Sequence, residues 1–254
     1  MLLPRIIPVL LLKNRGLVKG VRFKDHRYVG DPINAVQIFN TKKVDELFIL
    51  DITATEENRI PDLELVQSIS DQCLMPFALG GGIKTLDDAK RVLNSGAEKV
   101  SLNTYALESK TLIEEIAKVF GSQSVVVSLD IKKNIFGNYC VYSRCGTSLI
   151  SKDLNLILRQ IEDQGAGEVL INNIDTDGMC DGYDLNLLSK VTNLTKIPVI
   201  ASGGAWLVDH LKVALEQTKI SAVAAGSMFV FHGRRKAVLI SYPSDSELIS
   251  IRGE

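Results

Sequence analysis

Small residues gather at four places in the chain where phosphate groups could bind. An apolar run ends in each case at Gly80-Gly81-Gly82, at 101–104, at Ser202-Gly203-Gly204 or at Gly226-Ser227. Glycine lets backbone N–H groups approach an anion closely, and a following helix N-terminus adds a favourable dipole. One such segment alone is more often a tight turn. Two related pairs of such segments, half a barrel apart, indicate two phosphate sites across one opening. The ligand is then expected to be an elongated small molecule with two phosphate groups.

Carboxylates that could transfer protons occur at the ends of similar runs, at Asp51, Asp130, Asp175 and Asp177. Asp130 is the strongest candidate, because it directly follows the largely apolar run 125–129. For each aspartate, a helix N-cap or a loop hydrogen bond is an equally good explanation. The sequence therefore predicts proton-transfer chemistry with Asp130 at its centre.

Nucleophilic and metal chemistry have weaker support in the sequence. The four cysteines form no CxxC pair, and the three histidines are isolated, so no metal site is expected. Arg144 could lower the pKa of the neighbouring Cys145 thiol, but no histidine base is paired with it. Lys19 is expected on a glycine-rich loop, where it would either reach an anionic substrate or be solvated.

A second set of charged residues stands at the opposite ends of the apolar runs. Arg5, Glu46, Lys99 and Glu168 each lie just before or at the start of a run. We expect them to form a ring of alternating charge on the face away from the candidate phosphate motifs. A structural ring of salt bridges is a sufficient explanation for them.

The elements that position these residues are eight short aliphatic runs, most of them followed by helical patterns. The runs are hydrophobic almost without interruption, which is typical of parallel strands buried on both faces. They are 5–11, 47–51, 77–80, 99–102, 125–130, 168–171, 198–201 and 222–225, with helices expected at 86–95, 111–120, 154–164 and 185–191. Eight such units in 254 residues predict an α/β fold, a single (βα)8 TIM barrel over 1–254. A doubly wound sheet is the alternative, but no G-x-G-x-x-G follows the first run.

The two halves of the chain resemble each other at an offset of roughly 120 residues. Asp51-Ile52-Thr53 is similar to Asp175-Thr176-Asp177, and the Gly80 motif is similar to the Ser202 motif. This indicates two (βα)4 halves in one barrel. Matching the halves places Leu11 opposite Asp130, where a symmetric catalytic pair would need an acid.

Composition excludes several classes of partner. The chain has 29 Lys+Arg against 30 Asp+Glu, and a net charge of −1 gives no reason to expect nucleic acid or an anionic membrane. The apolar stretch 1–12 is too short to span a bilayer and is interrupted by Arg5, so a buried strand is expected there. A soluble protein of the reducing cytoplasm fits the cysteine usage.

Taken together, these segments resemble the cyclase subunit of imidazole glycerol phosphate synthase, the HisF family, over nearly the whole chain. The strings that carry the resemblance include Arg5-Ile6-Ile7, Val18-Lys19-Gly20, Gly30-Asp31-Pro32, Asp51-Ile52-Thr53-Ala54, Gly80-Gly81-Gly82-Ile83, Asn103-Thr104, Asp177-Gly178 and Ala201-Ser202-Gly203-Gly204. The resemblance implies a barrel that pairs with a HisH-like glutaminase subunit. Ammonia released by the partner would cross the barrel to a substrate at the opposite rim. It implies no cofactor and no metal.

The resemblance also implies roles for individual residues. Asp130 matches one of the family's two catalytic aspartates, whereas the other falls on Leu11, which cannot transfer protons. Arg5, Glu46, Lys99 and Glu168 match the charged gate at the ammonia entrance. The phosphate contacts implied are Gly82, Asn103, Thr104, Asp177, Gly178, Gly204, Gly226 and Ser227.

Three functions follow from an intact gate beside an incomplete catalytic pair. The first is an ammonia conduit for sugar amidation in surface-polysaccharide biosynthesis, as in HisF-like paralogues of the WbuZ type, serving a separate ATP-dependent sugar amidotransferase. The second is a working cyclase of histidine biosynthesis, with Asp51 or Asp177 replacing the missing acid. The third is a non-catalytic scaffold that binds a phosphorylated metabolite.

Overall fold

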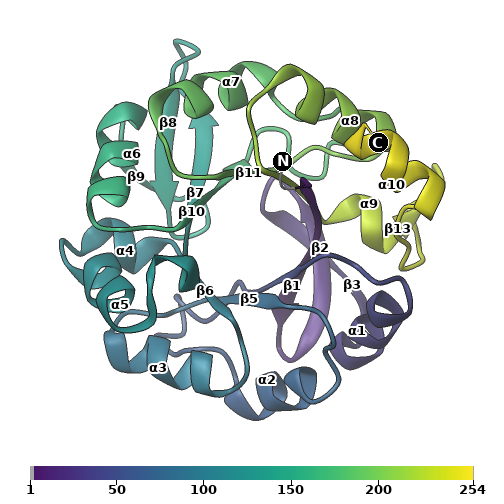
Figure 1. Ribbon diagram of the computed structural model, residues 1–254, viewed down its shortest axis with the longest axis horizontal. Helices are drawn as coiled ribbons and strands as arrows, with labels where there is room; N and C mark the ends of the chain where they lie inside the picture. Colours follow the sequence, from purple (N-terminus) through teal and green to yellow (C-terminus); the bar gives the residue numbers. More distant parts are fainter. Residues whose placement is uncertain (1–2, 254) are drawn as a thin grey trace.

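The computed structural model describes residues 3–253, in which eight parallel strands close into a barrel (Figure 1). Pairing runs unbroken around the barrel, because β1 pairs with both β12 and β4, and β7 pairs with both β6 and β10. This confirms the predicted (βα)8 TIM barrel. The barrel strands are β1 (Arg5–Lys13), β4 (Leu47–Asp51), β5 (Phe77–Gly80), β6 (Lys99–Leu102), β7 (Val125–Lys133), β10 (Glu168–Asn173), β11 (Val199–Ser202) and β12 (Ala222–Ala225).

Alternate side chains of these strands fill the barrel interior with an apolar cluster. Leu11 and Leu50 pack against this cluster and are only partly buried. The interior is therefore a packed aliphatic core, as in other barrels of this kind. Its buried members are Ile7, Val9, Phe48, Ala78, Val126, Leu170, Ile200, Ala222 and Ala224.

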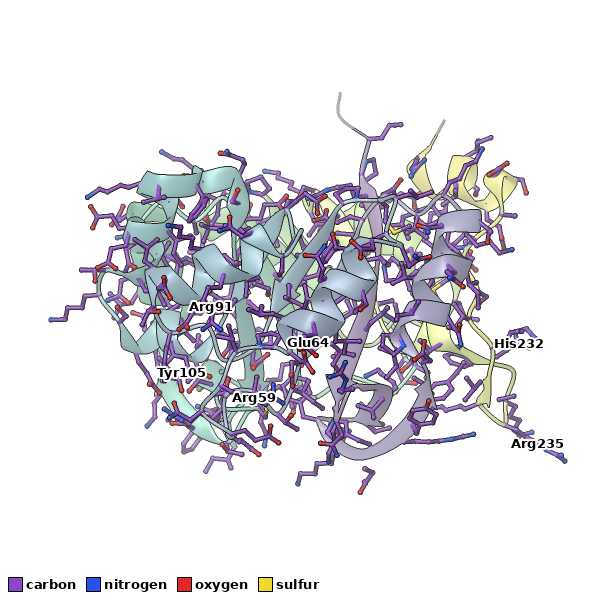
Figure 2. The ribbon with its side chains drawn as sticks, turned by 90° about the horizontal axis from the view of Figure 1, so that it is seen from below. Arg59, Glu64, Arg91, Tyr105, His232 and Arg235 are labelled. Atoms are coloured by element: carbon purple, nitrogen blue, oxygen red, sulfur yellow. The ribbon has the colours of Figure 1, made fainter. Side chains whose placement is uncertain are left out.

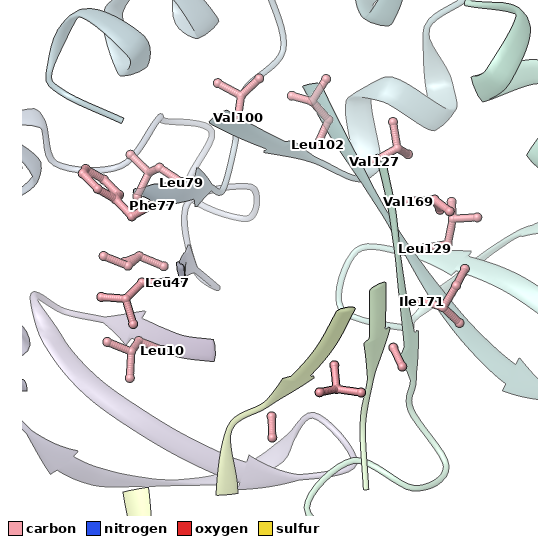
Figure 3. Packing of buried hydrophobic residues seen from close by; sticks show 14 of the residues in the cluster. Leu10, Leu47, Phe77, Leu79, Val100, Leu102, Val127, Leu129, Val169 and Ile171 are labelled. Carbon is pink, nitrogen blue, oxygen red and sulfur yellow. The ribbon is translucent and has the colours of Figure 1, made fainter. Parts of the chain in front are cut away.

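The other set of strand side chains forms a larger core between the strands and the helices. Figure 3 shows Leu47, Phe77, Val100, Val127 and Ile171 pointing outward from successive strands. Strands that are buried on both faces need the continuous apolar runs seen in the sequence. The two cores together explain why those runs predicted the strand positions to within a few residues.

The helices of the outer ring begin at residues that cap them. Asp62 accepts hydrogen bonds from the first backbone N–H groups of its helix, and Thr85 forms a capping box with Asp88. The helices are α1 (Pro32–Thr41), α2 (Leu63–Ser70), α3 (Leu86–Asn94), α4 (Thr104–Glu108), α5 (Leu112–Phe120), α6 (Leu154–Asp163), α7 (Leu185–Leu194), α8 (Val208–Gln217), α9 (Ser227–Val230) and α10 (Asp245–Arg252), with a 3₁₀ turn η1 (Ser122–Ser124). The four predicted helices are present, with ends shifted by at most a few residues.

Two antiparallel hairpins at the carboxyl ends of the barrel strands were not predicted from the sequence. The first is built from β2 (Gly16–Val21) and β3 (Lys24–Gly30), and β2 pairs with the end of β1. The second is built from β8 (Tyr139–Ser143) and β9 (Ser148–Ser151), and β8 pairs with the end of β7. Both hairpins extend a barrel strand beyond the barrel and stand at its mouth.

The last part of the described chain contains a small hairpin of β13 (Phe231–His232) and β14 (Ala237–Val238) before α10. Arg252 of α10 donates to both carboxylate oxygens of Asp45 at 2.8 Å. The C-terminal helix is thereby held against the amino-terminal face of the barrel. Within residues 3–253 no helix is both long and apolar enough to cross a membrane.

Candidate active site

A cavity of about 330 Å³ opens at the carboxyl ends of β1, β4, β5, β6 and β7. Figure 2 shows the barrel from the side, with Arg59 and Tyr105 on the mouth side, away from the N-terminus. Both hairpins contribute to the wall, through Phe23 and His26 on one side and Arg144 and Cys145 on the other. The site therefore lies where enzymes of this fold place their chemistry.

Asp130 lies in the floor of this cavity and is the predicted catalytic residue. The Nδ2 of Asn103 donates to its Oδ2 at 3.0 Å and to the Ser128 carbonyl at 2.9 Å. Burial raises the pKa of Asp130 to about 7, against the opposing hydrogen bonds from Asn103 and Asn172 and with a further increase from Asp177. A carboxyl group with this pKa can both accept and donate a proton near neutral pH.

Leu11 lines the same cavity, on the strand β1 side. Its backbone pairs with Leu50 of β4 and Val18 of β2, so the hairpin begins directly beside it. Its side chain adds apolar surface where the half-barrel comparison required an acid. The mouth therefore presents Asp130 on β7 and a leucine on the opposite strand, β1.

The predicted phosphate residues of the first half of the barrel lie together in the cavity wall: Gly82, Asn103 and Thr104. Gly82 has φ +64, and a Cβ there would meet the Arg59 carbonyl oxygen at 1.8 Å, so only glycine fits. The Thr104 hydroxyl already accepts a hydrogen bond from the Arg144 N–H at 3.2 Å. The first group is thus tied to the β8–β9 turn.

Several groups of the second set contact other parts of the chain, and none of its residues lines this cavity. Asp177 is paired with Lys19, and the Gly178 carbonyl accepts from Lys236 Nζ at 3.1 Å. Gly204 packs on the Gly182 carbonyl, Gly226 packs on the Lys19 side chain, and Ser227 is buried at the start of α9. The structure therefore places one predicted phosphate group in the wall of this cavity and the other outside it, with the Asp177 carboxylate and the Gly178 carbonyl paired within the chain.

The other aspartates of the rim have structural partners. Asp51 accepts from Arg59 Nη1 at 2.6 Å and from the backbone N–H groups of Thr53 and Ala54. Asp175 accepts from the Lys133 N–H at 2.8 Å. These are the loop hydrogen bonds given above as the alternative to proton transfer.

Two expectations about single residues are wrong. Lys19 is neither solvated nor free to reach a substrate, because it is 5% exposed on β2 and its Nζ lies 2.8 Å from Asp177 Oδ1. The pKa of Cys145 is raised to about 11, not lowered: although the residue is exposed, desolvation of its thiol among neighbouring groups and the negative charges of Asp130 and Glu56 disfavour the thiolate. The guanidinium of Arg144 instead pairs with Glu108.

At the opposite end of the barrel, the four charged residues form a closed ring of ion pairs. Arg5 contacts both Glu46 and Glu168, and Lys99 Nζ lies 2.9 Å from Glu46 and 2.8 Å from Glu168. Glu46 is 2% exposed. Burial opposes the charge of Glu168, but hydrogen bonds and charge from Arg5 and Lys99 hold its pKa below the usual range. The ring closes the amino-terminal end of the apolar interior.

Comparison with known proteins identifies the family. The family model described as histidine biosynthesis protein matches residues 5–235. A Pseudomonas aeruginosa protein provisionally named imidazole glycerol phosphate synthase subunit hisF2 is 49% identical over 96% of this chain and 97% of its own length. A Vibrio vulnificus protein, provisionally hisF3, is 48% identical over 97% and 95%. The HisF subunit of Exiguobacterium sibiricum is 39% identical over 100% and 98%.

The chain belongs to the HisF family. This confirms the resemblance on which the roles of the mouth and ring residues were predicted. The roles that the resemblance implies for Leu11, Asp130 and the four ring residues stay predictions.

Several residues at this HisF-family mouth were missed by sequence reasoning. Lys13, Phe23 and His26 line the cavity because the β2–β3 hairpin folds over it, and Arg59 reaches back to Asp51 from the loop after β4. Burial and the charges of Lys13 and Lys19 lower the pKa of His26. Only the glycines around Lys19 hinted at a structured segment here. Among residues 3–253, no group of three or more His, Cys, Asp or Glu could hold a metal ion.

Proposed function

We propose that this HisF-family barrel is the ammonia-conducting subunit of a glutamine amidotransferase, serving sugar amidation in surface-polysaccharide biosynthesis. One observation carries the proposal: a ring of four ion-paired residues lies at one end of the barrel, while at the other end Leu11 lines the cavity where the resemblance implies an acid. The predicted entrance thus has its charged groups, and the mouth lacks one member of the expected proton-transfer pair.

Ammonia would have to cross this packed apolar interior as the neutral molecule. Between the ring and the mouth the axis is lined by aliphatic and aromatic side chains, with Ala78, Ala222 and Ala224 as its smallest members. A charged ammonium ion pays a large desolvation cost in such surroundings, whereas uncharged ammonia does not. A HisH-like glutaminase docked below the ring, the partner that the resemblance implies, would supply that ammonia.

The contacts that Asp177 and Gly178 make within the chain support the same function. Asp177 and Gly178 hold Lys19 and Lys236, so on this side of the mouth the motif anchors loops. A conduit needs shaped loops at its outlet and does not need a bisphosphate site. An ATP-dependent sugar amidotransferase would be the enzyme that uses the ammonia.

The test measures glutamine hydrolysis and imidazole formation by the barrel co-purified with its glutaminase. The complex should hydrolyse glutamine, yet the barrel supplied with ammonium and the family's bisphosphate ribulosyl substrate should form no imidazole product. Robust imidazole formation would overturn the conduit function. Leu11→Asp tests whether the missing acid alone limits imidazole formation. Leu11→Asn is the matched control, because its side chain has a similar shape but cannot transfer protons.

The second candidate is a working cyclase, and one observation favours it. Asp130 retains a pKa of about 7 inside a cavity that still contains Gly82, Asn103 and Thr104. In this case wild-type barrel should turn over the bisphosphate substrate with ammonium, and Asp130→Asn should lower the rate by about 100-fold or more.

A further inference from the structure

Two large apolar side chains stand exposed at the tip of the β7–β8 hairpin. Ile135 is 94% exposed and Phe136 is 80% exposed. The turn beneath them is rigidly built, because Asn134 Oδ1 accepts hydrogen bonds from the Phe136 N–H at 2.9 Å and the Asn138 N–H at 3.0 Å. Gly137, at φ +78, completes the turn and donates to the Asn134 carbonyl. Apolar residues held in water in a fixed geometry indicate a contact surface.

The segment that carries this tip, residues 131–152, has one sign of charge. It contains Lys132, Lys133, Arg144 and Lys152 and no aspartate or glutamate. Lys133 pairs with Asp184 and Arg144 pairs with Glu108. Lys132 and Lys152 are exposed, and in the described part of the chain neither has a carboxylate within salt-bridge distance. We call residues 131–152 the basic arm.

The basic arm starts and ends at the mouth of the barrel. It continues β7 directly after Asp130, and its second turn, at Arg144 and Cys145, lines the mouth cavity. In Figure 1 the β7–β8 hairpin projects past the ring of helices between α6 and α7. The root of the basic arm therefore lies at the mouth, and its apolar tip lies outside the ring of helices, so a protein that covers the mouth on this side could contact both.

We propose that the basic arm docks the enzyme that consumes the ammonia, through an apolar pocket bordered by carboxylates. The proposal rests on the proposed conduit function. Ammonia released into open water takes a proton and is lost as a nucleophile, so its acceptor must lie against the mouth. Carboxylates around the pocket of the partner would pair with Lys132 and Lys152. Phe136 would be the aromatic anchor that such contacts usually have at their centre.

Other occupants fit the site less well. A second copy of this chain placed mouth to mouth would seal the outlet and offers no acceptor. A membrane rich in anionic lipid would match the lysines and the apolar tip, but it contains no group that ammonia attacks. Both become outcomes of the test.

The first experiment identifies what contacts the tip. A photoreactive phenylalanine analogue replaces Phe136 in cells, and the same analogue at Ile38 on α1, which is also exposed, serves as the control. We expect the Phe136 position alone to crosslink a protein that, once purified, consumes ammonium with ATP. Crosslinking to a second copy of this chain, or to no such enzyme, would overturn the proposal.

The second experiment measures transfer of nitrogen from [amide-15N]glutamine to the product of that enzyme. Ile135→Ser with Phe136→Ser should lower transfer by at least about tenfold, while glutamine hydrolysis and the reaction with free ammonium stay unchanged. Lys132→Glu should lower transfer in the same way. Unchanged transfer, or wild-type binding to phosphatidylglycerol vesicles that the double variant loses, would overturn the proposal.

The two proposals fail separately. If glutamine-derived nitrogen never reaches the product, even in the wild-type complex, the conduit function is wrong. A Phe136 crosslink to an ammonium-consuming enzyme would then still support the docking surface.

Discussion

Lys19 Nζ lies 2.8 and 3.0 Å from the two carboxylate oxygens of Asp177, and this ion pair joins the β2–β3 hairpin to the opposite side of the barrel mouth. Lys19 is 5% exposed, and its side chain packs against Gly226. The pair is reinforced by the Arg22 N–H, which donates to the Asp177 carbonyl at 2.9 Å. Asp177 and Gly226, two of the predicted phosphate residues, thus hold the β2–β3 hairpin in place.

Removal of one member of this pair should destabilise the chain. Lys19→Met leaves the Asp177 carboxylate without its cation in a largely buried position, at a cost of about 3 kcal/mol. Urea unfolding of Lys19→Met, Asp177→Asn and the double variant measures this. The double variant should regain part of the loss, because it leaves no unpaired charge. Additive losses would show that the two side chains do not interact.

The stability of the chain should depend on pH through Asp130. Burial raises its pKa from 3.8 to about 7, so the folded chain keeps this proton at pH values where the unfolded chain has lost it. The contribution of Asp130 to the free energy of unfolding is full below the unfolded pKa. It then falls by about 1.4 kcal/mol per pH unit until the folded pKa is passed.

Asp130→Asn removes this dependence and tests its sign. Relative to wild type, the variant should become more stable as the pH rises from about 5 to about 7, as measured by urea unfolding in each buffer. A constant difference between variant and wild type over this range would show that the pKa of Asp130 is not raised.

The ring at the amino-terminal end should be sensitive to loss of its most buried member. Glu46→Gln removes the charge that contacts both Arg5 and Lys99, and it should lower the free energy of unfolding by about 3 kcal/mol. Glu46→Gln with Lys99→Met should restore part of it, because the remaining Arg5–Glu168 pair is balanced. The midpoint of thermal unfolding provides an independent measurement: it should be lowest for Glu46→Gln and partly restored in the double variant.

Cys145 should react slowly with alkylating reagents despite its position at the mouth. Desolvation, followed by the charges of Asp130 and Glu56, raises the pKa of its thiol to about 11, so little thiolate exists at neutral pH. The rate of alkylation by iodoacetamide, assigned by comparison with Cys145→Ser, should rise about tenfold per pH unit up to that pKa. Asp130→Asn should increase the rate at a given pH, and a pH-independent rate would contradict the shift.

The positions of the barrel strands could be predicted from the sequence because the information is local. A strand buried on both faces needs an unbroken apolar run, and runs such as 47–51 and 222–225 coincide with observed strands to the residue. Asp130 and the four ring residues stand at the ends of these runs, so their distribution between the two faces followed from strand direction. The family could also be recognised from short strings of residues.

The two hairpins could not be predicted, because their polar and glycine-containing strands lack a clear alternation. The partner of Lys19 lies 158 residues away, and only the closed barrel brings the two together. The pKa values of Asp130 and Cys145 depend on desolvation and on charges from other segments of the chain. The sequence by itself determined the barrel and the charged residues at its two ends, and it predicted an acid at the position that Leu11 occupies. Tertiary structure decided which polar groups remain open to a ligand, because pairing and desolvation arise only when remote segments meet.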